Sequence, residues 1–343
     1  MKGSRFICLF LLSGILAGPD VSLASGKEEP PGDSLSIDTA MIADYKQQLT
    51  ARFYFLFQDA SFVLNPGSSD ILVYKPNVAG RIGITAFYRW YGIGLSMGIP
   101  YLRLDPDDYG KTSSLDLRIN AYGNQFAAEI FAQYYKGFYI RSPEQPDGTK
   151  YTVPDMMMFS VGVNAYWIYN YKRFSIRAAF INNERQKKSA GSLIIRPTFL
   201  FYSISSSNGI IPPELAESEH IKEYEVLRTG NFYALGLAPG YSYTFVFLKN
   251  FYINGAVFPG IYWQNYSYQT TTHSHTDFEF SFLVGARIAL GYNSDAWFIG
   301  ASLITGINDV PSILGDSQFY YDVAQIRFWG GTRFDLFRKK KKN

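Results

Sequence analysis

The segment 278–293, with the sequence FEFSFLVGARIALGYN, has an apolar side chain at every even position. Its odd positions mix apolar residues with glycine, Glu279 and Arg287, so an extended chain has one apolar and one mixed face. Strands of soluble sheets usually span about 3 to 10 residues. A strand that crosses a bilayer in a closed barrel needs about 9 to 11 and turns its apolar face to lipid. The segment therefore fits either a long strand of a soluble sandwich or a strand of a membrane barrel.

The same alternation recurs along most of the chain. In SLDLRINAYG, Leu115, Leu117 and Ile119 fall on one side, while Asp116 and Arg118 fall on the other. Aromatic residues make up 17% of the chain and often close the apolar face, as in the belts at the two membrane interfaces. The pattern gives thirteen candidate strands: 50–65, 71–90, 91–100, 113–123, 125–140, 155–170, 172–182, 190–206, 230–247, 250–268, 277–293, 295–306 and 319–337. We predict an all-β fold, a transmembrane antiparallel β-barrel of about 12 to 14 strands, with a secreted soluble β protein as the alternative.

The connections constrain the number of strands. Short turns and longer polar links should alternate around a membrane barrel, and they do so over residues 71–182 and again from residue 230. The two series are out of phase by one strand, and the count is odd, whereas single-chain bacterial barrels have even numbers. One element between residues 172 and 230 is therefore misread. A hidden strand in EHIKEYEVLRTG would give fourteen strands, and a misread at 183–189 would give twelve.

The amino terminus indicates export. Lys2 and Arg5 precede an apolar stretch that ends in a small-residue cleavage pattern, so residues 1–24 are predicted to be a signal peptide. Cys8 within it is the only cysteine, so the remaining chain has no thiol chemistry. No later segment offers the roughly 18 consecutive apolar residues of a membrane helix. We expect location in the cell outer membrane, with a polar leader at 25–49, the barrel at 50–337 and a basic tail at 338–343.

The charge of the chain and the sequence of its carboxy terminus indicate which binding partners to expect. Removal of residues 1–24 leaves 30 basic and 28 acidic side chains, and five of the basic ones lie at 338–342 in the tail RKKKKN. In an exported protein this tail is better explained by a charged membrane surface than by nucleic acid. The strand QIRFWGGTRFDLF resembles the terminal strand that the outer-membrane assembly machinery recognises, although the tail follows its last aromatic residue, Phe337. We expect outer-membrane lipid and this machinery as partners, expect no nucleic acid, and leave the oligomeric state open.

Four peptides carry a family resemblance. They are, in order, LVYKPNVAGRIGITAFYRWYGIGLSMGIP, QYYKGFY, RQKKSAGS and APGYSYTFVFLKNFYINGAVFPG. Together they resemble a family of uncharacterised Bacteroidota outer-membrane proteins, a domain of unknown function, over roughly residues 38–337. The resemblance implies an outer-membrane barrel and implies no activity.

Residue types suited to catalysis or metal binding are few. His273, His275 and Asp277 share one face of an extended chain in TTTHSHTDF, a spacing that suits a divalent metal. The simpler interpretation is a polar external loop that contains two histidines. His220 stands beside a serine and a glutamate, as an acyl-hydrolase dyad or triad would require, but neighbours in one loop rarely have the required geometry. We predict no catalytic residues, no bound metal and no cofactor.

The face opposite the lipid carries more chemistry. Reading the alternation along each strand assigns nine arginines and four carboxylates to the lumen. They are Arg81, Arg89, Arg118, Arg173, Arg177, Arg196, Arg287, Arg327 and Arg333, with Asp116, Glu129, Glu279 and Asp335. One interpretation is a narrow barrel filled by paired side chains, because buried charges need partners. The other is a wet passage whose positive wall favours anionic solutes.

These patterns lead to one functional prediction and one alternative. We predict a non-enzymatic outer-membrane barrel that acts as a pore or as a structural or binding component. The alternative is a membrane-embedded lipid hydrolase or acyltransferase, which would need a histidine to converge with a serine or carboxylate at the outer rim.

Overall fold

The computed structural model describes residues 36–65, 71–78, 80–216, 227–269, 274–305, 307–310 and 318–335. The predicted signal peptide and basic tail lie outside these residues, as do His220 and His273. No helix among the described residues is long and apolar enough to cross a membrane.

One antiparallel sheet dominates the fold and closes on itself. It contains fourteen strands among the described residues, two of which, β3 and β15, have only four residues each. The strands are β2 (Leu49–Asn65), β3 (Leu72–Lys75), β4 (Arg81–Tyr88), β5 (Tyr91–Gly98), β6 (Ser113–Tyr122), β7 (Phe126–Glu144), β8 (Lys150–Ile168), β10 (Ala190–Ser205), β11 (Thr229–Phe247), β12 (Phe251–Gln269), β13 (Ser274–Asn293), β14 (Trp297–Thr305), β15 (Ile307–Val310) and β16 (Gln318–Phe334). The ring closes because β16 pairs with β2 from Phe334 opposite Leu49 to Gln318 opposite Asn65. The predicted antiparallel barrel is confirmed.

The two four-residue strands complete the wall at one end of the barrel. β4, β5 and β6 are shorter than β2 and β7, and β3 pairs with both longer strands beyond the point where the three short ones end. β15 pairs with β16 just after β14 does, and so extends the position of β14 in the ring. Without these two, the ring of the described residues has twelve strands, the lower of the two predicted numbers.

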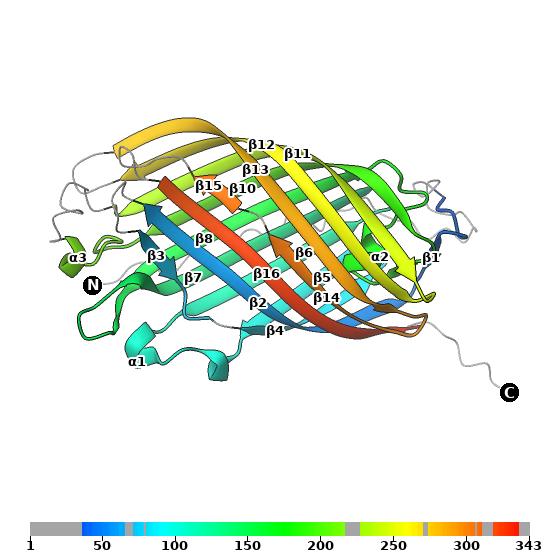
Figure 1. The fold of residues 1–343 in the computed structure, drawn as a ribbon, viewed down its shortest axis with the longest axis horizontal. Coiled ribbons are helices and arrows are strands. Elements are labelled where there is room, and N and C mark those ends of the chain that lie inside the picture. Colours follow the sequence, from blue (N-terminus) through cyan, green and yellow to red (C-terminus); the bar gives the residue numbers. More distant parts are fainter. Residues whose placement is uncertain are drawn as a thin grey trace, which may run out of the picture. The chain divides into compact units, whose positions relative to one another are not determined.

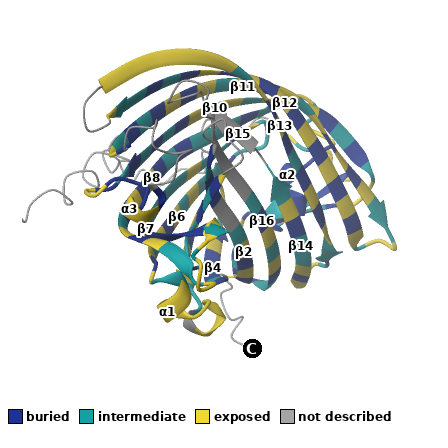
Figure 2. Ribbon diagram, turned by 60° about the vertical axis from the view of Figure 1, so that its left-hand side comes forward, coloured by how far each residue is buried: buried dark blue, intermediate teal, exposed yellow. Residues whose placement is uncertain are grey.

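Successive residues of each long strand face opposite sides of the wall, because side chains alternate along a strand. On β13, Val284 is 47% exposed on the outer face, whereas Ala289 on the inner face is fully buried. Figure 2 shows the resulting alternation of exposed and buried bands along β11 to β14. The outer face is rich in phenylalanine, leucine and isoleucine, which suits contact with lipid. The alternation predicted for residues 278–293 is confirmed.

The connections divide the barrel into two ends, which Figure 1 shows on opposite sides. At the short-turn end, tight turns join β4 to β5, β6 to β7, β11 to β12 and β13 to β14. This end also holds β1 (Ile42–Asp44), α2 (Ile176–Phe180) and β9 (Glu184–Gln186). The long-loop end carries α1 (Pro106–Tyr109) and α3 (Pro213–Ala216).

The strand predicted at 172–182 is wrong, and this error explains the odd strand count. The chain forms α2 there instead, beginning after Ser175, whose hydroxyl accepts a hydrogen bond from the Ala178 amide. Serine at this position stabilises the first turn of a helix. Four of the five α2 residues are buried, so the apolar positions of this segment pack inside the barrel and not against lipid. The region predicted as a polar leader also contributes, because β1 pairs with β9.

Candidate functional site

The short-turn end of the lumen is filled by a plug, which we define as residues 172–186 with α2 and β9. The Tyr252 hydroxyl donates to the Ala179 carbonyl at 2.9 Å, and Arg52 donates to the Phe180 carbonyl at 2.6 Å. Trp329 donates from its indole nitrogen to Asn182 at 2.8 Å. These partners come from β12, β2 and β16, so the plug is bonded to several parts of the wall.

A buried charge pair lies within the plug. Arg177 lies 3.6 Å from Glu184, and both side chains are almost fully buried. The Ser175 hydroxyl donates to the other carboxylate oxygen of Glu184 at 2.5 Å, and Lys46 lies 3.8 Å from the first. Arg177, predicted to line the lumen wall, therefore belongs to the plug, where its charge is compensated locally.

The long-loop end of the lumen is filled by apolar side chains, which we call the apolar cluster. It draws residues from β2, β3, β7, β8, β10, β11 and β12 and from the link that carries α3. Tyr202 stacks on Phe232 with ring centroids 4.5 Å apart, and Phe62 contacts Tyr74 at 5.6 Å. Ile210 from the α3 link packs into the same cluster. The described part of the barrel is therefore not an open tube at this end.

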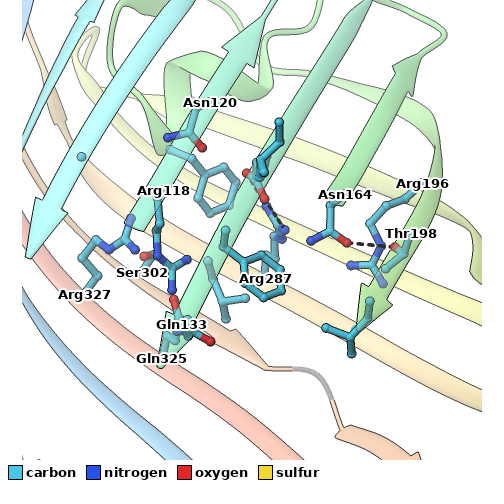
Figure 3. Close-up of a pocket in the computed structure, with 18 of the residues that line it drawn as sticks. Arg118, Asn120, Gln133, Asn164, Arg196, Thr198, Arg287, Ser302, Gln325 and Arg327 are labelled. Carbon is cyan, nitrogen blue, oxygen red and sulfur yellow. Dashed lines mark hydrogen bonds and ion pairs between the residues drawn. The ribbon is translucent and has the colours of Figure 1, made fainter. Parts of the chain in front are cut away.

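Between the plug and the apolar cluster lies a chamber of about 220 Å³. Five arginines line it, and Figure 3 shows four of them: Arg118 and Arg327 beside each other, Arg287 in the middle and Arg196 on the far side. The fifth, Arg52, is also a plug contact. The neutral polar residues that complete the wall include Asn120, Gln133, Asn164, Thr198, Ser302 and Gln325.

Glu129 and Arg287 form a hydrogen-bonded network in the chamber wall. Arg287 donates two parallel hydrogen bonds to the Glu129 carboxylate, at 3.1 and 2.9 Å. The Tyr166 hydroxyl donates to the same carboxylate at 2.8 Å, and the Tyr122 hydroxyl donates to it as well. The bidentate geometry is the strong form of an arginine–carboxylate pair. This network joins β6, β7, β8 and β13 across the lumen.

A second carboxylate is neutralised in the same way. Arg118 donates to Asp116 at 3.0 and 3.2 Å, and Gln133 donates to it at 2.6 Å. Asp116 and Glu129 therefore each form an ion pair with one arginine, and neither pairs with a second arginine among the described residues.

Three guanidinium groups of the chamber have no carboxylate partner among the described residues: Arg52, Arg196 and Arg327. Arg196 donates to the Tyr262 hydroxyl at 3.0 Å and lies 4.7 Å from the Phe258 ring. Arg327 makes no hydrogen bond to any described residue and lies 5.0 Å from the Tyr54 ring. Because arginine stays protonated in proteins, this wall has a surplus of fixed positive charge that favours an anion.

The structure separates the residues that the sequence assigned to the lumen. It brings Arg118, Arg196, Arg287, Arg327 and Glu129 to the chamber wall, with Asp116 bonded to Arg118. Arg81 is buried on β4 outside the chamber and bonds to Ser96, while Arg333 bonds to the plug.

Four of the assigned residues are exposed and do not reach the chamber. Arg89 lies in the β4–β5 turn, and Arg173 lies in the plug segment ahead of α2, so neither stands on a strand. Glu279 lies toward the long-loop end of β13, beyond the part of β13 that pairs with β14. Asp335 follows the last residue of β16.

Arg52 is a chamber residue that the sequence reading missed. The alternation along β2 indicates its position, because ARFYFLF puts Arg52, Tyr54 and Leu56 at alternate positions on one face, and all three are buried.

The described residues give little support to the predicted metal site and to the predicted acyl-hydrolase site. His275 lies 3.8 Å from Asp277, and both side chains are about half exposed. The described residues contain no group of three side chains suited to hold a metal ion. Because His273 and His220 lie outside the described residues, both hypotheses stay predictions.

Fold and site together define a class: an antiparallel transmembrane β-barrel whose lumen holds an arginine-lined chamber between two filled ends. The chain belongs to the family described as Domain of unknown function (DUF4421), which matches residues 36–313. The predicted resemblance to a family of unknown function is confirmed in this respect, and the Bacteroidota origin stays a prediction. No curated protein matches the sequence.

Several solved structures are similar to the barrel at low identity. The outer membrane protease OmpT from Escherichia coli has 9% identity and a TM-score of 0.34, covering 84% of this chain and 95% of that one. The translocator domain of the autotransporter NalP from Neisseria meningitidis has 8% identity and a TM-score of 0.34, covering 88% and 90%. The toluene transporter TodX from P. putida has 7% identity and a TM-score of 0.27, covering 85% and 90%. Values this low carry no activity over to this chain.

Proposed function

We propose that this protein is an outer-membrane barrel that binds a small anionic group in its internal chamber. The observation that carries the proposal is the group of three guanidiniums, from Arg52, Arg196 and Arg327, that have no carboxylate partner among the described residues. Charged groups taken out of bulk water need a compensating partner. An anion in the chamber would supply it, with bidentate contacts that suit carboxylate or phosphate oxygens.

Binding of an anion is favoured over its free conduction because the plug fills the lumen on one side of the chamber and the apolar cluster fills it on the other. The plug is bonded to side chains of β2, β12 and β16, and at the other end Ile210 of the α3 link packs with buried apolar residues of seven strands. A water-filled anion pore would instead need a continuous polar wall.

Residence in the outer membrane is part of the proposal. The apolar outer face, the closed ring and the predicted signal peptide support it. Since short turns of such barrels face the periplasm, the plug would lie on the periplasmic side. Fractionation, with heated and unheated gel samples compared, tests this location.

Titration calorimetry with inorganic phosphate on the purified barrel in detergent tests the binding. Arg327→Gln and Arg196→Gln should each weaken binding about tenfold or more, because hydrogen bonds to charged groups contribute about 1.5–3 kcal/mol. Arg89→Gln is the matched control, since this arginine is exposed in a turn away from the chamber. Equal affinity in all four proteins, or no binding by any, would contradict the proposal.

Planar-bilayer recordings provide a second test. We expect the intact protein to pass little steady current, because the plug and the apolar cluster stand in series with the chamber. A sustained, anion-selective current through the intact barrel would instead support an open pore and contradict the binding proposal.

A further inference from the structure

The wall of the barrel has an unpaired stretch between β11 and β12. The two strands pair on either side of it, the last pairs being Leu237 with Ile261 and Tyr241 with Val257. Three facing positions between them are unpaired, and they hold Ala-Pro-Gly at 238–240 and Phe-Pro-Gly at 258–260. We call these six residues the proline seam. Proline has no N–H to donate to the ladder, and here Pro239 and Pro259 face each other.

The seam lies midway along both strands, which are 19 residues long each. In hydrocarbon, a backbone carbonyl without a partner is costly, so strands of membrane barrels are normally paired throughout. A second gap lies nearby, because β8 and β10 are unpaired at Arg196 and Pro197 while the residues before and after are paired. The wall beside Arg196 therefore has weakened ladders on two sides, and the strands there separate more easily.

An apolar groove crosses the outer face beside the seam. Its lining includes Pro197 from β10, Leu235 and Leu237 from β11 and Ile261 and Trp263 from β12. These side chains face lipid, so an acyl chain of the bilayer is continuous with the groove. Thr198 lines both this groove and the chamber, so a single strand thickness separates lipid from the arginines.

A chain of contacts links the groove to the chamber. Gly236 forms part of the groove floor, and a Cβ placed there would lie only 2.1 Å from the Tyr262 ring, so this ring lies directly behind the floor. The Tyr262 hydroxyl accepts a hydrogen bond from Arg196. Arg196 in turn lies over Phe258, a seam residue. A movement of Tyr262 and Phe258 would thus join the groove to a guanidinium that pairs with no carboxylate in the described part of the chain.

We propose that the chamber binds the carboxylate of a single-chain fatty acid, which reaches it from the bilayer through the proline seam while its acyl chain occupies the groove. This rests on the proposed anion binding and names its ligand class and route. Charge complementarity with Arg196 selects the carboxylate, and the lipid-facing groove selects the chain. The seam is three residues long, about 10 Å at 3.3 Å per residue, which admits one acyl chain more readily than a two-chain lipid.

The test uses the whole barrel in lipid vesicles, with palmitate as the ligand and hexadecanol as its uncharged counterpart. Palmitate should bind and hexadecanol should not compete with it. Arg196→Gln should weaken palmitate binding about tenfold, while Arg89→Gln should leave it unchanged. Hexadecanol competing as well as palmitate, or equal binding by both variants, would overturn the assignment of the carboxylate to the chamber.

The route is tested by locking the seam. The Pro239→Cys/Pro259→Cys variant places two thiols at facing positions, within reach of a disulfide. The control is Phe245→Cys/Ile253→Cys, a facing pair on the same two strands where the ladder is intact. Residues 25–343 have no other cysteine. Oxidation should slow palmitate uptake about tenfold or more in the seam variant and leave the control unchanged, and reduction should restore the rate.

The outcomes separate this inference from the binding proposal on which it rests. Phosphate binding without palmitate binding overturns the fatty acid and leaves the proposed function intact. Palmitate uptake that is equally fast through the oxidised seam overturns the route. Two-chain phosphatidic acid that binds as well as palmitate overturns the single-chain assignment. If neither phosphate nor palmitate binds, the proposed function itself fails.

Discussion

Replacing Glu129 by glutamine should destabilise the barrel more than any exposed carboxylate replacement. The substitution removes the negative charge of the Glu129 carboxylate, which accepts two hydrogen bonds from Arg287 and one from each of two tyrosine hydroxyls. It keeps the size of the side chain, so packing changes little. Arg287 would then remain charged, with its side chain only 7% exposed and no carboxylate opposite it.

The size of the effect follows from this burial. Removal of one partner from a buried ion pair costs about 3–5 kcal/mol. Because the Glu129 side chain is 23% exposed toward the chamber, we expect a value near the lower limit. Glu144→Gln is the matched control: this carboxylate pairs with Lys150 but is 58% exposed, and exposed pairs contribute about 0–1 kcal/mol.

Urea unfolding in lipid vesicles, followed by tryptophan fluorescence, gives the free energy of unfolding for each variant. A double-mutant cycle with Arg287→Met should show a coupling energy of about 1 kcal/mol or more, because the two substitutions remove one shared interaction. Additive effects, or a loss for Glu129→Gln no larger than for Glu144→Gln, would refute the claim that this pair is a buried, mutually dependent unit.

Three further predictions concern the wall, the plug and the location. Val284→Arg places a guanidinium in the lipid-facing band and should lower stability by roughly 2–4 kcal/mol, whereas Ser281→Arg on the inner face should cost less; the reverse order in the same bilayer would invert the assigned faces. Ser175→Ala removes the cap of α2, worth about 1 kcal/mol, together with the hydrogen bond to Glu184. It should speed hydrogen exchange of plug amides while β12 amides stay protected, and unchanged plug exchange would count against this role of Ser175. In cell fractions the protein should accompany the outer membrane and shift mobility on heating, and recovery as a soluble periplasmic protein would contradict the barrel's location.

The alternation of side chains can be predicted from the sequence because it is a local property of a strand. A residue on a strand faces the side opposite to its neighbours whatever the rest of the chain does. The outward position of Val284 and the inward positions of Arg118 and Arg287 follow from this rule alone. The same rule places Arg52 inside, on the face of β2 that also carries Tyr54 and Leu56.

The plug shows where local pattern fails. RFSIRAAF alternates like its neighbours, yet it forms α2, because its apolar residues meet a cavity wall and not lipid. The contacts that decide this lie far away in sequence: Asn182 bonds to Trp329, 147 residues on, and Ala179 to Tyr252, 73 residues on. The periodicity of the segment therefore contains no information about those distant partners.

By itself, then, the sequence determined that this chain builds long two-faced strands, that they close into a barrel, and that arginine gathers inside. Only the tertiary structure decided which arginines are neutralised. Glu129 meets Arg287 across 158 residues of chain, and no carboxylate of the described residues pairs with Arg52, Arg196 or Arg327. The side on which a residue faces depends on its own strand, whereas the partner of a charge depends on which strands the closed ring places opposite one another.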